Sequence, residues 1–248
     1  MSYFSNSIRS SVEGRHEKKS DEKYYNALKA LSRTSFGCIY ILDLKTEKME
    51  FISQNPFLFA GLSSKEVEKI GYKFFRKYAK EEDIKILKEV NSAGFRFFEC
   101  LTHEEKKSHT ISYDFHIKNE NNTDILINHK ITPIEICDEG KISKIVCKVS
   151  YSLNKTAGNI SVSSTSSDIF WKYNLSTGKW SEESKITLKS REVEIIRLYL
   201  QGLKIEEIAQ HLFVSPTTIK FHRSKLFEKI GVNNITEAIS YVVSNNLI

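Results

Sequence analysis

The sequence predicts an α+β protein, with an antiparallel sheet in its N-terminal part and four short helices at its C-terminal end. Apolar and polar side chains alternate over residues 109–151, and turn residues interrupt the alternation, as in successive antiparallel strands. Residues 152–167 have the composition of a linker, because 11 of these 16 residues are Ser, Thr, Asn or Gly. Residues 188–248 carry closely spaced helix start and stop signals. We therefore expect two folded parts joined by a linker.

The composition is that of an ordinary globular protein with a small positive charge. Of the 248 residues, 37 are Lys or Arg and 31 are Asp or Glu, which gives a net charge of +6. No apolar run reaches the about 18 residues of a membrane span, and the N-terminus lacks the apolar core of a secretory signal. We expect a cytoplasmic protein without a membrane partner. The four cysteines form no C-x-x-C pair, so no metal site and no cofactor are expected.

Changes in the pattern divide the chain into four segments. The first 20 residues are rich in Ser and charge and are expected to form a basic tail. A helix is expected over residues 20–33, capped by Ser20, with Tyr24, Leu28 and Leu31 on one side. The four segments are a tail with its leading helix (1–35), a sheet-containing domain (36–151), a Ser-rich linker with a small hairpin (152–187) and a helical domain (188–248).

Within the sheet-containing domain, helices are expected between the second and third strands. A helix over 81–98 has acidic residues 81–83 in its first turn, where the helix dipole favours them. Its expected buried face consists of Ile84, Leu87, Val90 and Phe95. The expected strands are 36–43, 49–53, 109–118, 124–137 and 141–151, with several short helices over 55–80. In the hairpin that follows, Trp171 and Trp180 predict packing against a neighbouring part of the protein.

The C-terminal residues predict a tight turn between two helices, of which the second is basic. Ser215 is a good N-cap, Pro216 stands at the first helical position, and Gly231 ends this second helix. Two helices joined in this way have the shape of a helix-turn-helix. The expected helices cover 190–200, 205–212 and 216–230, and a fourth helix follows.

A helical wheel of residues 216–230 separates an apolar face from an outward face. Ile219, Leu226 and Ile230 share the apolar face, which must point into the core. An exposed Phe is unusual on a solvated face, but in a DNA major groove it could meet thymine methyl groups. The outward face carries Thr217, Phe221 and Ser224, flanked by Lys220 and Lys225.

Charge alone would favour a basic, solvated face on a small structural bundle. The wider motif, however, resembles the LuxR/GerE-type helix-turn-helix family across the whole C-terminal segment. Ile235 departs from the family, which often has Arg there. The matching positions are Leu188-x-x-Arg191-Glu192, Gly202, Glu207-Ile208-Ala209, Leu212, Ser215-x-x-Thr218-Ile219-Lys220-x-His222, Lys229-Ile230-Gly231-Val232 and Thr236-Glu237-Ala238.

The resemblance implies that the third helix enters the major groove of DNA. It places Lys220, Phe221 and Ser224 at base edges, with Thr217 on the same face. It assigns phosphate contacts to Ser215, Thr218, Arg223 and Lys225. In this family the fourth helix commonly forms the dimer contact.

On the fourth helix, Ile239, Val242 and Val243 form an apolar stripe that is either core or dimer seam. Glu192 and Glu207 are expected to hold the bundle together through hydrogen bonds.

Residues 36–151 resemble a PAS domain in the order of their elements, with a five-stranded antiparallel sheet and helices on one face. A phosphoacceptor receiver is not expected, because Asp43 stands alone and the strand order differs. An acyl-homoserine-lactone domain is not expected, because Trp171 and Trp180 come too late in the chain. A haem-binding PAS domain would need an axial ligand, and we expect the three candidate histidines to be hydrogen-bonded or solvated instead: His103, His109 and His116.

The two resemblances imply a sequence-specific DNA-binding transcriptional regulator, which is not an enzyme and binds double-stranded DNA as a homodimer. The PAS-like domain would sense a ligand or partner or mediate dimerisation. Its interior is either a filled core, which we favour, or a pocket for a small apolar molecule. The transcription machinery would be a further partner. The alternative is a protein–protein adaptor that uses the PAS-like domain and the Trp-containing hairpin and binds DNA only weakly.

Overall fold

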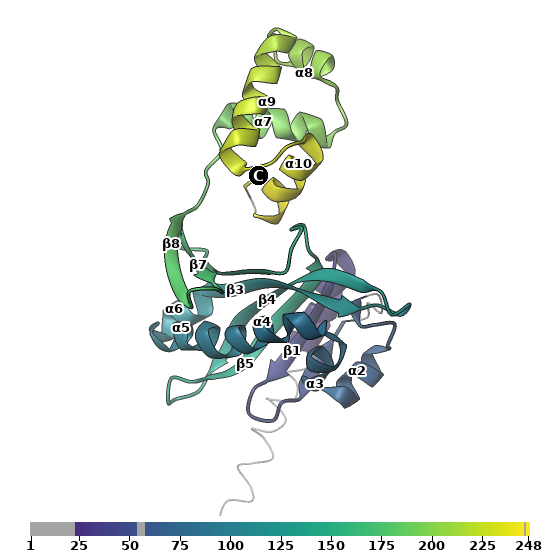
Figure 1. Ribbon diagram of the computed structural model, residues 1–248, viewed down its shortest axis with the longest axis vertical. Coiled ribbons are helices and arrows are strands. Elements are labelled where there is room, and N and C mark those ends of the chain that lie inside the picture. Colours follow the sequence, from purple (N-terminus) through teal and green to yellow (C-terminus); the bar gives the residue numbers. More distant parts are fainter. Residues whose placement is uncertain (1–22, 54–57, 246) are drawn as a thin grey trace, which may run out of the picture. The chain divides into compact units, whose positions relative to one another are not determined.

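The computed structural model describes residues 23–53, 58–245 and 247–248 (Figure 1). The chain divides into two compact units, Met1–Ser167 with Trp171–Ser181 and Asp168–Phe170 with Glu182–Ile248. The expected tail and the expected cap at Ser20 lie outside the described residues. None of the described helices combines the length and the hydropathy that crossing a membrane requires.

An antiparallel sheet forms the centre of the first unit. Its strands β2, β1, β5, β4 and β3 lie side by side in that order, and this confirms the predicted five-stranded PAS-like sheet. Among the described residues the sheet continues past β3 with three more strands, in the order β6-β7-β8. The strands are β1 (Cys38–Asp43), β2 (Met49–Ile52), β3 (His109–Lys118), β4 (Asp124–Ile136), β5 (Ile142–Tyr151), β6 (Gly158–Ser164), β7 (Ile169–Asn174) and β8 (Lys179–Ser184).

Strand β6 corrects the prediction of a linker over residues 152–167. Ile160 and Val162 alternate with polar residues and are buried, and Val162 stands opposite Ile111 of β3. Asp114 of β3 is also buried, and it accepts hydrogen bonds from the side-chain amides of three asparagines. They are Asn128 (2.9 Å), Asn154 (2.6 Å) and Asn159 (2.9 Å). The Ser-rich composition suggested a linker, but strand pairing and these amides order the segment.

Helices cover one face of this sheet (Figure 1). The expected long helix over 81–98 contains a π-helical segment, which rotates its buried face. Val90 is buried, as predicted, and so are Ile86 and Phe98, whereas the predicted core residues Ile84, Leu87 and Phe95 are only partly buried. The elements are α2 (Ser64–Ile70), α3 (Lys73–Tyr78), η2 (Glu81–Asp83), α4 (Ile84–Glu89), η3 (Val90–Gly94), α5 (Phe95–Glu99) and α6 (His103–Ser108).

Helix α6 is absent from the sequence prediction. Thr102 accepts a hydrogen bond from the Glu105 amide, and the Glu105 carboxylate accepts one from the Thr102 amide, so the two form a capping box. This T-x-x-E signal could have been recognised. His103 is consequently helical, and Nδ1 of His109 is hydrogen-bonded to the Glu105 carbonyl at 2.7 Å.

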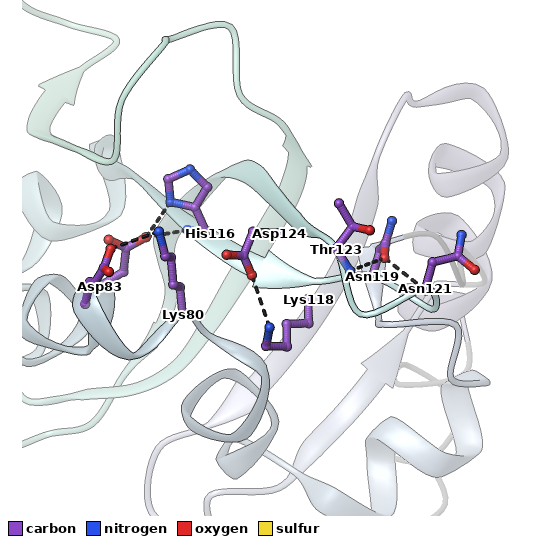
Figure 2. Close-up of polar contacts among 9 residues, drawn as sticks. Lys80, Asp83, His116, Lys118, Asn119, Asn121, Thr123 and Asp124 are labelled. Carbon is purple, nitrogen blue, oxygen red and sulfur yellow. Dashed lines mark hydrogen bonds and ion pairs between the residues drawn. The ribbon is translucent and has the colours of Figure 1, made fainter.

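Another hydrogen-bonded histidine fastens the start of the helical region to the sheet (Figure 2). One Asp83 carboxylate oxygen lies 2.7 Å from both the His116 amide nitrogen and His116 Nδ1. The sequence predicted only that Asp83 complements the helix dipole. In the structure Asp83 is also buried and joins the helix to the sheet. Further along β3, Asn119 accepts the amides of Asn121 and Thr123 at 2.9 Å and so forms the expected turn.

Aromatic side chains fill the space between the sheet and its helices. Phe74 meets Phe59 and Phe75 edge to face, with ring centroids 5.4 and 5.2 Å apart. Phe75 also contacts Phe115 and the buried His129. This dense packing is that of an ordinary protein core.

His129 is hydrogen-bonded on both sides within this core. Its Nε2 lies 2.8 Å from the Tyr40 hydroxyl, and its Nδ1 meets the Tyr113 hydroxyl. Burial lowers the pKa of His129 to about 3, so the ring is neutral. A neutral imidazole has one donor and one acceptor nitrogen, so one tyrosine donates to the ring and the other accepts from it.

The β7–β8 hairpin packs as its tryptophans predicted. The rings of Trp171 and Trp180 lie 5.2 and 5.1 Å from Phe97, measured between centroids. The Tyr173 hydroxyl donates to Glu89 at 2.7 Å.

Residues 23–34 are helical, as expected, but the apolar side differs from the prediction. Tyr25 stacks on Phe51 of β2 with the ring centroids 6.2 Å apart, whereas Tyr24 and Leu31 are exposed.

The second unit contains the predicted C-terminal helices. Their observed bounds agree with the predicted ones to within one residue, because each end has a local capping signal. The helices are α7 (Ser190–Leu200), α8 (Ile205–His211), α9 (Pro216–Ile230) and α10 (Ile235–Ser244). Helix α9 contacts all three of the others.

Candidate nucleic-acid interface

Helix α9 begins at the expected cap. The Ser215 hydroxyl accepts the Thr218 amide at 3.1 Å and lies 2.9 Å from the Thr218 hydroxyl, and Pro216 occupies the first turn. The positive end of the helix dipole therefore stands beside two hydroxyl groups. Such a terminus is suited to an anion such as phosphate.

The buried and the exposed face of α9 are the two faces that the helical wheel predicted. Ile219, Leu226 and Ile230 are buried and join the helix to the domain core. The ring of Phe221 is 59% exposed. The other exposed residues of the outward face are Thr217, Lys220, Ser224 and Lys225.

The four basic side chains of α9 differ in how far acidic neighbours neutralise their charges. Lys229 Nζ lies 2.9 Å from the Glu192 carboxylate of α7, so its charge is neutralised inside the domain. Lys225 is 3.6 Å from Glu228, but both side chains are exposed, and such pairs contribute little. Lys220 has no ion pair among the described residues. The free charge of α9 is thus smaller than the count of its basic residues.

Arg223 is the fourth cation, and it lies partly inside the domain. Its guanidinium carbon is 5.7 Å from the centroid of the Phe227 ring. Its Nε atom is buried and has no hydrogen-bond partner among the described residues. An unsatisfied buried donor costs about 1–3 kcal/mol, so an acceptor supplied from outside the domain would stabilise this arrangement.

Glu192 holds the bundle together, as expected. Besides Lys229, its carboxylate accepts the Lys189 amide at 2.8 Å. Burial by itself would raise the pKa of Glu192, but the hydrogen bonds from Lys229 and Lys189 outweigh it and lower the pKa below its usual value. Glu207 instead accepts the Lys204 amide at 2.7 Å and so caps the start of α8. The link between α7 and the end of α8 comes from Arg191, which donates to the Leu212 carbonyl at 3.2 Å.

The apolar stripe of α10 is divided between the core and the surface. Val242 is 0% exposed and packs in the domain core, so it is not available as part of a dimer seam. Val243 is 51% exposed and Ile239 is partly buried. The alternation along the sequence could not separate these roles, because only the packing of α10 against α9 and α7 determines which side is covered.

One exposed side chain in this unit is absent from the sequence prediction. Phe213 lies in the turn between α8 and α9, and it is 95% exposed. The residue that follows the end of a helix at this place is usually Gly or Asn. A Phe there is the sequence signal that could have identified the position.

Two solved structures that resemble this chain cover different shares of it. A phage VqmA–DPO complex covers 93% of this chain and 91% of that one, with 16% identity and a TM-score of 0.34. The PAS-B domain of Drosophila melanogaster Cycle with bound ethylene glycol covers 46% of this chain and 99% of that one, with 17% identity and a TM-score of 0.35.

Two curated relatives each match about a quarter of this chain. The Fimbriae Z protein of Salmonella typhimurium is 38% identical over 61 residues, 25% of this chain and 29% of that protein. The CsgBAC operon transcriptional regulatory protein of Escherichia coli is 37% identical over 67 residues, 27% of this chain and 31% of that protein. The matched segment thus spans about a third of the length of these relatives.

The family model that matches is described as "Bacterial regulatory proteins, luxR family", and it covers residues 187–242. These residues include α7, α8, α9 and most of α10. Residues 187–242 of this chain therefore form a LuxR-type helix-turn-helix domain.

Proposed function

We propose that this chain is a sequence-specific DNA-binding transcriptional regulator that reads DNA with α9 and catalyses no reaction. The observation that carries the proposal is the outward face of α9, where exposed polar and aromatic side chains stand opposite a firmly buried apolar face. Two relatives named as transcriptional regulatory proteins each match 27% of this chain. A regulator of this kind acts in the cytoplasm, where the bacterial chromosome lies.

Lys220, Phe221 and Ser224 are the residues proposed to read base edges, with Thr217 beside them. A lysine recognises the acceptor atoms of guanine in the major groove, and an apolar ring contacts the methyl group of thymine. All four side chains are exposed on one face of α9, so they can enter a groove together.

Ser215, Thr218, Arg223 and Lys225 are the residues proposed to hold phosphates. Ser215 and Thr218 stand at the positive end of the helix dipole. The unsatisfied Nε atom of Arg223 supports its assignment, because a phosphate oxygen is a suitable acceptor. Phosphate contacts fix the position of the helix, and the base contacts then select the sequence.

The regulator is proposed to bind as a homodimer that reads two symmetry-related half-sites. Ile239 and Val243 remain as the candidates for a seam on α10, since Val242 belongs to the core.

The PAS-like domain is proposed to provide the input through its surface, with its interior as a filled core. The close aromatic packing and the fully paired His129 support this choice. A small ligand in the interior is the competing proposal. A stabilising thermal shift with any member of a metabolite library, lost when Phe75 is replaced, would favour the ligand.

The adaptor alternative requires the tryptophans of the hairpin to be free for a partner. Trp171 and Trp180 instead pack against Phe97, so replacing both with Ala is expected to lower stability and to leave DNA binding intact.

The proposal as a whole is tested by selecting duplexes from a random-sequence pool with the full-length protein. We expect an enriched motif with two half-sites and an affinity that falls as salt rises. Failure to enrich any sequence, together with no salt-dependent binding, would overturn the proposal.

A further inference from the structure

Three helices of the C-terminal domain end in the same backbone motif. In each, a residue just beyond the helix donates its amide to a carbonyl five residues earlier, and the residue before it has a positive φ. The bonds are Leu203 to Leu198 (3.2 Å) after α7, Val214 to Ala209 (3.0 Å) after α8 and Val232 to Phe227 (3.0 Å) after α9.

The residue at the positive-φ position differs at one of the three ends. It is Gly202 after α7 (φ 85°) and Gly231 after α9 (φ 70°), but Phe213 after α8 (φ 54°). A side chain in this conformation crowds the backbone and costs about 1–2 kcal/mol relative to Gly. The end of α8 therefore carries strain that the other two ends avoid.

The Phe213 ring does not recover this cost inside the domain. Leu212 and Val214 on either side pack into the core, whereas Phe213 is 95% exposed. Its amide hydrogen bond to Gln210 (3.2 Å) would be made equally well by a glycine. An exposed aromatic residue on a strained backbone gives the isolated domain no advantage, so its contact is with something outside the domain.

The position of Phe213 indicates which partner this is. Phe213 stands two residues before Ser215, the N-cap of α9, and the two line one hollow, which Glu206 and Gln210 of α8 also line. Ser215 is one of the residues proposed above to hold a phosphate. Between successive phosphates of a DNA strand lie the carbon atoms of deoxyribose, which offer an apolar surface next to each charge.

We infer that Phe213 is a positioning residue that packs against the deoxyribose of the DNA backbone at the N-terminus of α9. This inference rests on the proposed function. It adds a contact that neither reads a base nor neutralises a phosphate. Its loss weakens the binding of every duplex by the same factor, and it leaves the slope of log Kd against log salt unchanged, because no counterion is released by an apolar contact.

The test compares full-length wild-type protein with the variants F213N and F213G. Asn and Gly both tolerate positive φ, so both variants should unfold at a temperature a few degrees higher than the wild type. Both should bind the selected duplex and a random-sequence duplex about tenfold more weakly, which corresponds to about 1.4 kcal/mol. F213Y keeps the ring and should retain wild-type affinity. L200Q removes another exposed apolar side chain of the domain, on α7, and serves as the matched control that should bind normally.

The outcomes separate the inference from the proposed function. If the wild-type protein binds no duplex in a salt-dependent manner, the proposed function fails. If the wild type binds and F213N and F213G bind equally well, the inference is overturned. It is also overturned if both variants bind DNA normally but fail to regulate a reporter, because Phe213 then contacts a protein. A changed salt slope or a loss confined to the selected duplex would contradict the deoxyribose contact.

Discussion

The two units of this chain differ in how completely their buried polar groups are paired. In the sheet-containing unit, buried polar side chains satisfy one another: His129 with two tyrosines, Asp114 with three asparagine amides, and Asp83 with His116. In the helical domain, by contrast, lie both buried side-chain atoms that lack a partner within the described part of the chain, namely Arg223 Nε and the Tyr199 hydroxyl.

The difference is between a core whose polar groups are all paired and a surface that has a buried donor without an acceptor. A buried network in which every donor and acceptor is used stabilises the fold and leaves nothing for a ligand to satisfy. A buried donor without an acceptor instead gains free energy when a partner supplies one. The comparison thus favours a filled core in the PAS-like unit and an interface on α9. The following changes test it, from the largest expected effect to the smallest.

Replacing His129 with Leu should lower the free energy of unfolding by about 3 kcal/mol or more, because the Tyr40 and Tyr113 hydroxyls would each stay buried at a cost of about 1–3 kcal/mol. Urea unfolding of the full-length protein measures this loss. In the control H129L/Y40F/Y113F the imidazole and both hydroxyls are gone, and only the Cys147 thiol that Tyr40 also contacts remains, so much of the stability should return. Equal stability of H129L and the wild type would contradict the closed network.

Acid should destabilise the sheet-containing unit before the helical domain. The pKa of His129 is lowered by burial to about 3, below the value of 6.5 expected in the unfolded chain. Between these values the unfolded state binds a proton that the folded state does not, so stability falls as the pH falls. The expected slope is up to about 1.4 kcal/mol per pH unit. Above pH 6.5 His129 adds no pH dependence to the free energy of unfolding.

Glu192 offers the internal comparison for this pH series. The pKa of Glu192 is lowered, so its contribution to the helical domain is complete above the usual value of 4.5 and is lost only as the pH falls below it. Urea unfolding at pH 7, 6 and 5 should therefore show a loss confined to the sheet-containing unit. The loss should shrink in H129L, and an unchanged pH series in that variant would refute the assignment.

Lys220 and Lys225 are expected to contribute to DNA binding in different ways. K220A should relax the preference at one base position by about 1–3 kcal/mol, whereas K225A should weaken all duplexes alike and reduce the salt slope by about one. Competition binding with single-base variants of the selected duplex distinguishes the two. If both variants changed sequence preference equally, the division of α9 into base and phosphate contacts would be wrong.

Val243 provides the smallest expected change. V243S should alter stability by no more than about 0.5 kcal/mol, because the side chain is half exposed. It should nevertheless reduce the cooperative binding of two half-sites in a gel-shift titration. Undiminished cooperativity would contradict a dimer contact formed by α10.

The sequence predicted the helical domain better than the sheet, for a physical reason. Ser215, Pro216 and Gly231 set the bounds of α9 through local hydrogen bonds and backbone preferences, which a single segment contains. Strand β6 depends on pairing with β3, about fifty residues earlier, and its Ser-rich composition conceals the buried pair of Ile160 and Val162. Non-local pairing of this kind leaves only a weak trace in the local sequence.

The candidate site was predictable in its outline. Periodicity alone placed Ile219 inside and Lys220 beside the outward face. Periodicity could not reveal that Lys229 is neutralised by Glu192, that Val242 is buried or that Phe213 sits on a strained backbone, because each depends on a neighbouring helix or on the turn geometry.

Arg223 offers the most direct test of the central claim that α9 leaves a buried donor unsatisfied for DNA to complete. The measurement is the affinity of the wild type and of R223M for the selected duplex at several salt concentrations, with urea unfolding alongside. We expect R223M to be at least as stable as the wild type, to bind more weakly, and to have a salt slope smaller by about one. A variant that is less stable yet binds DNA with unchanged affinity and slope would contradict the account.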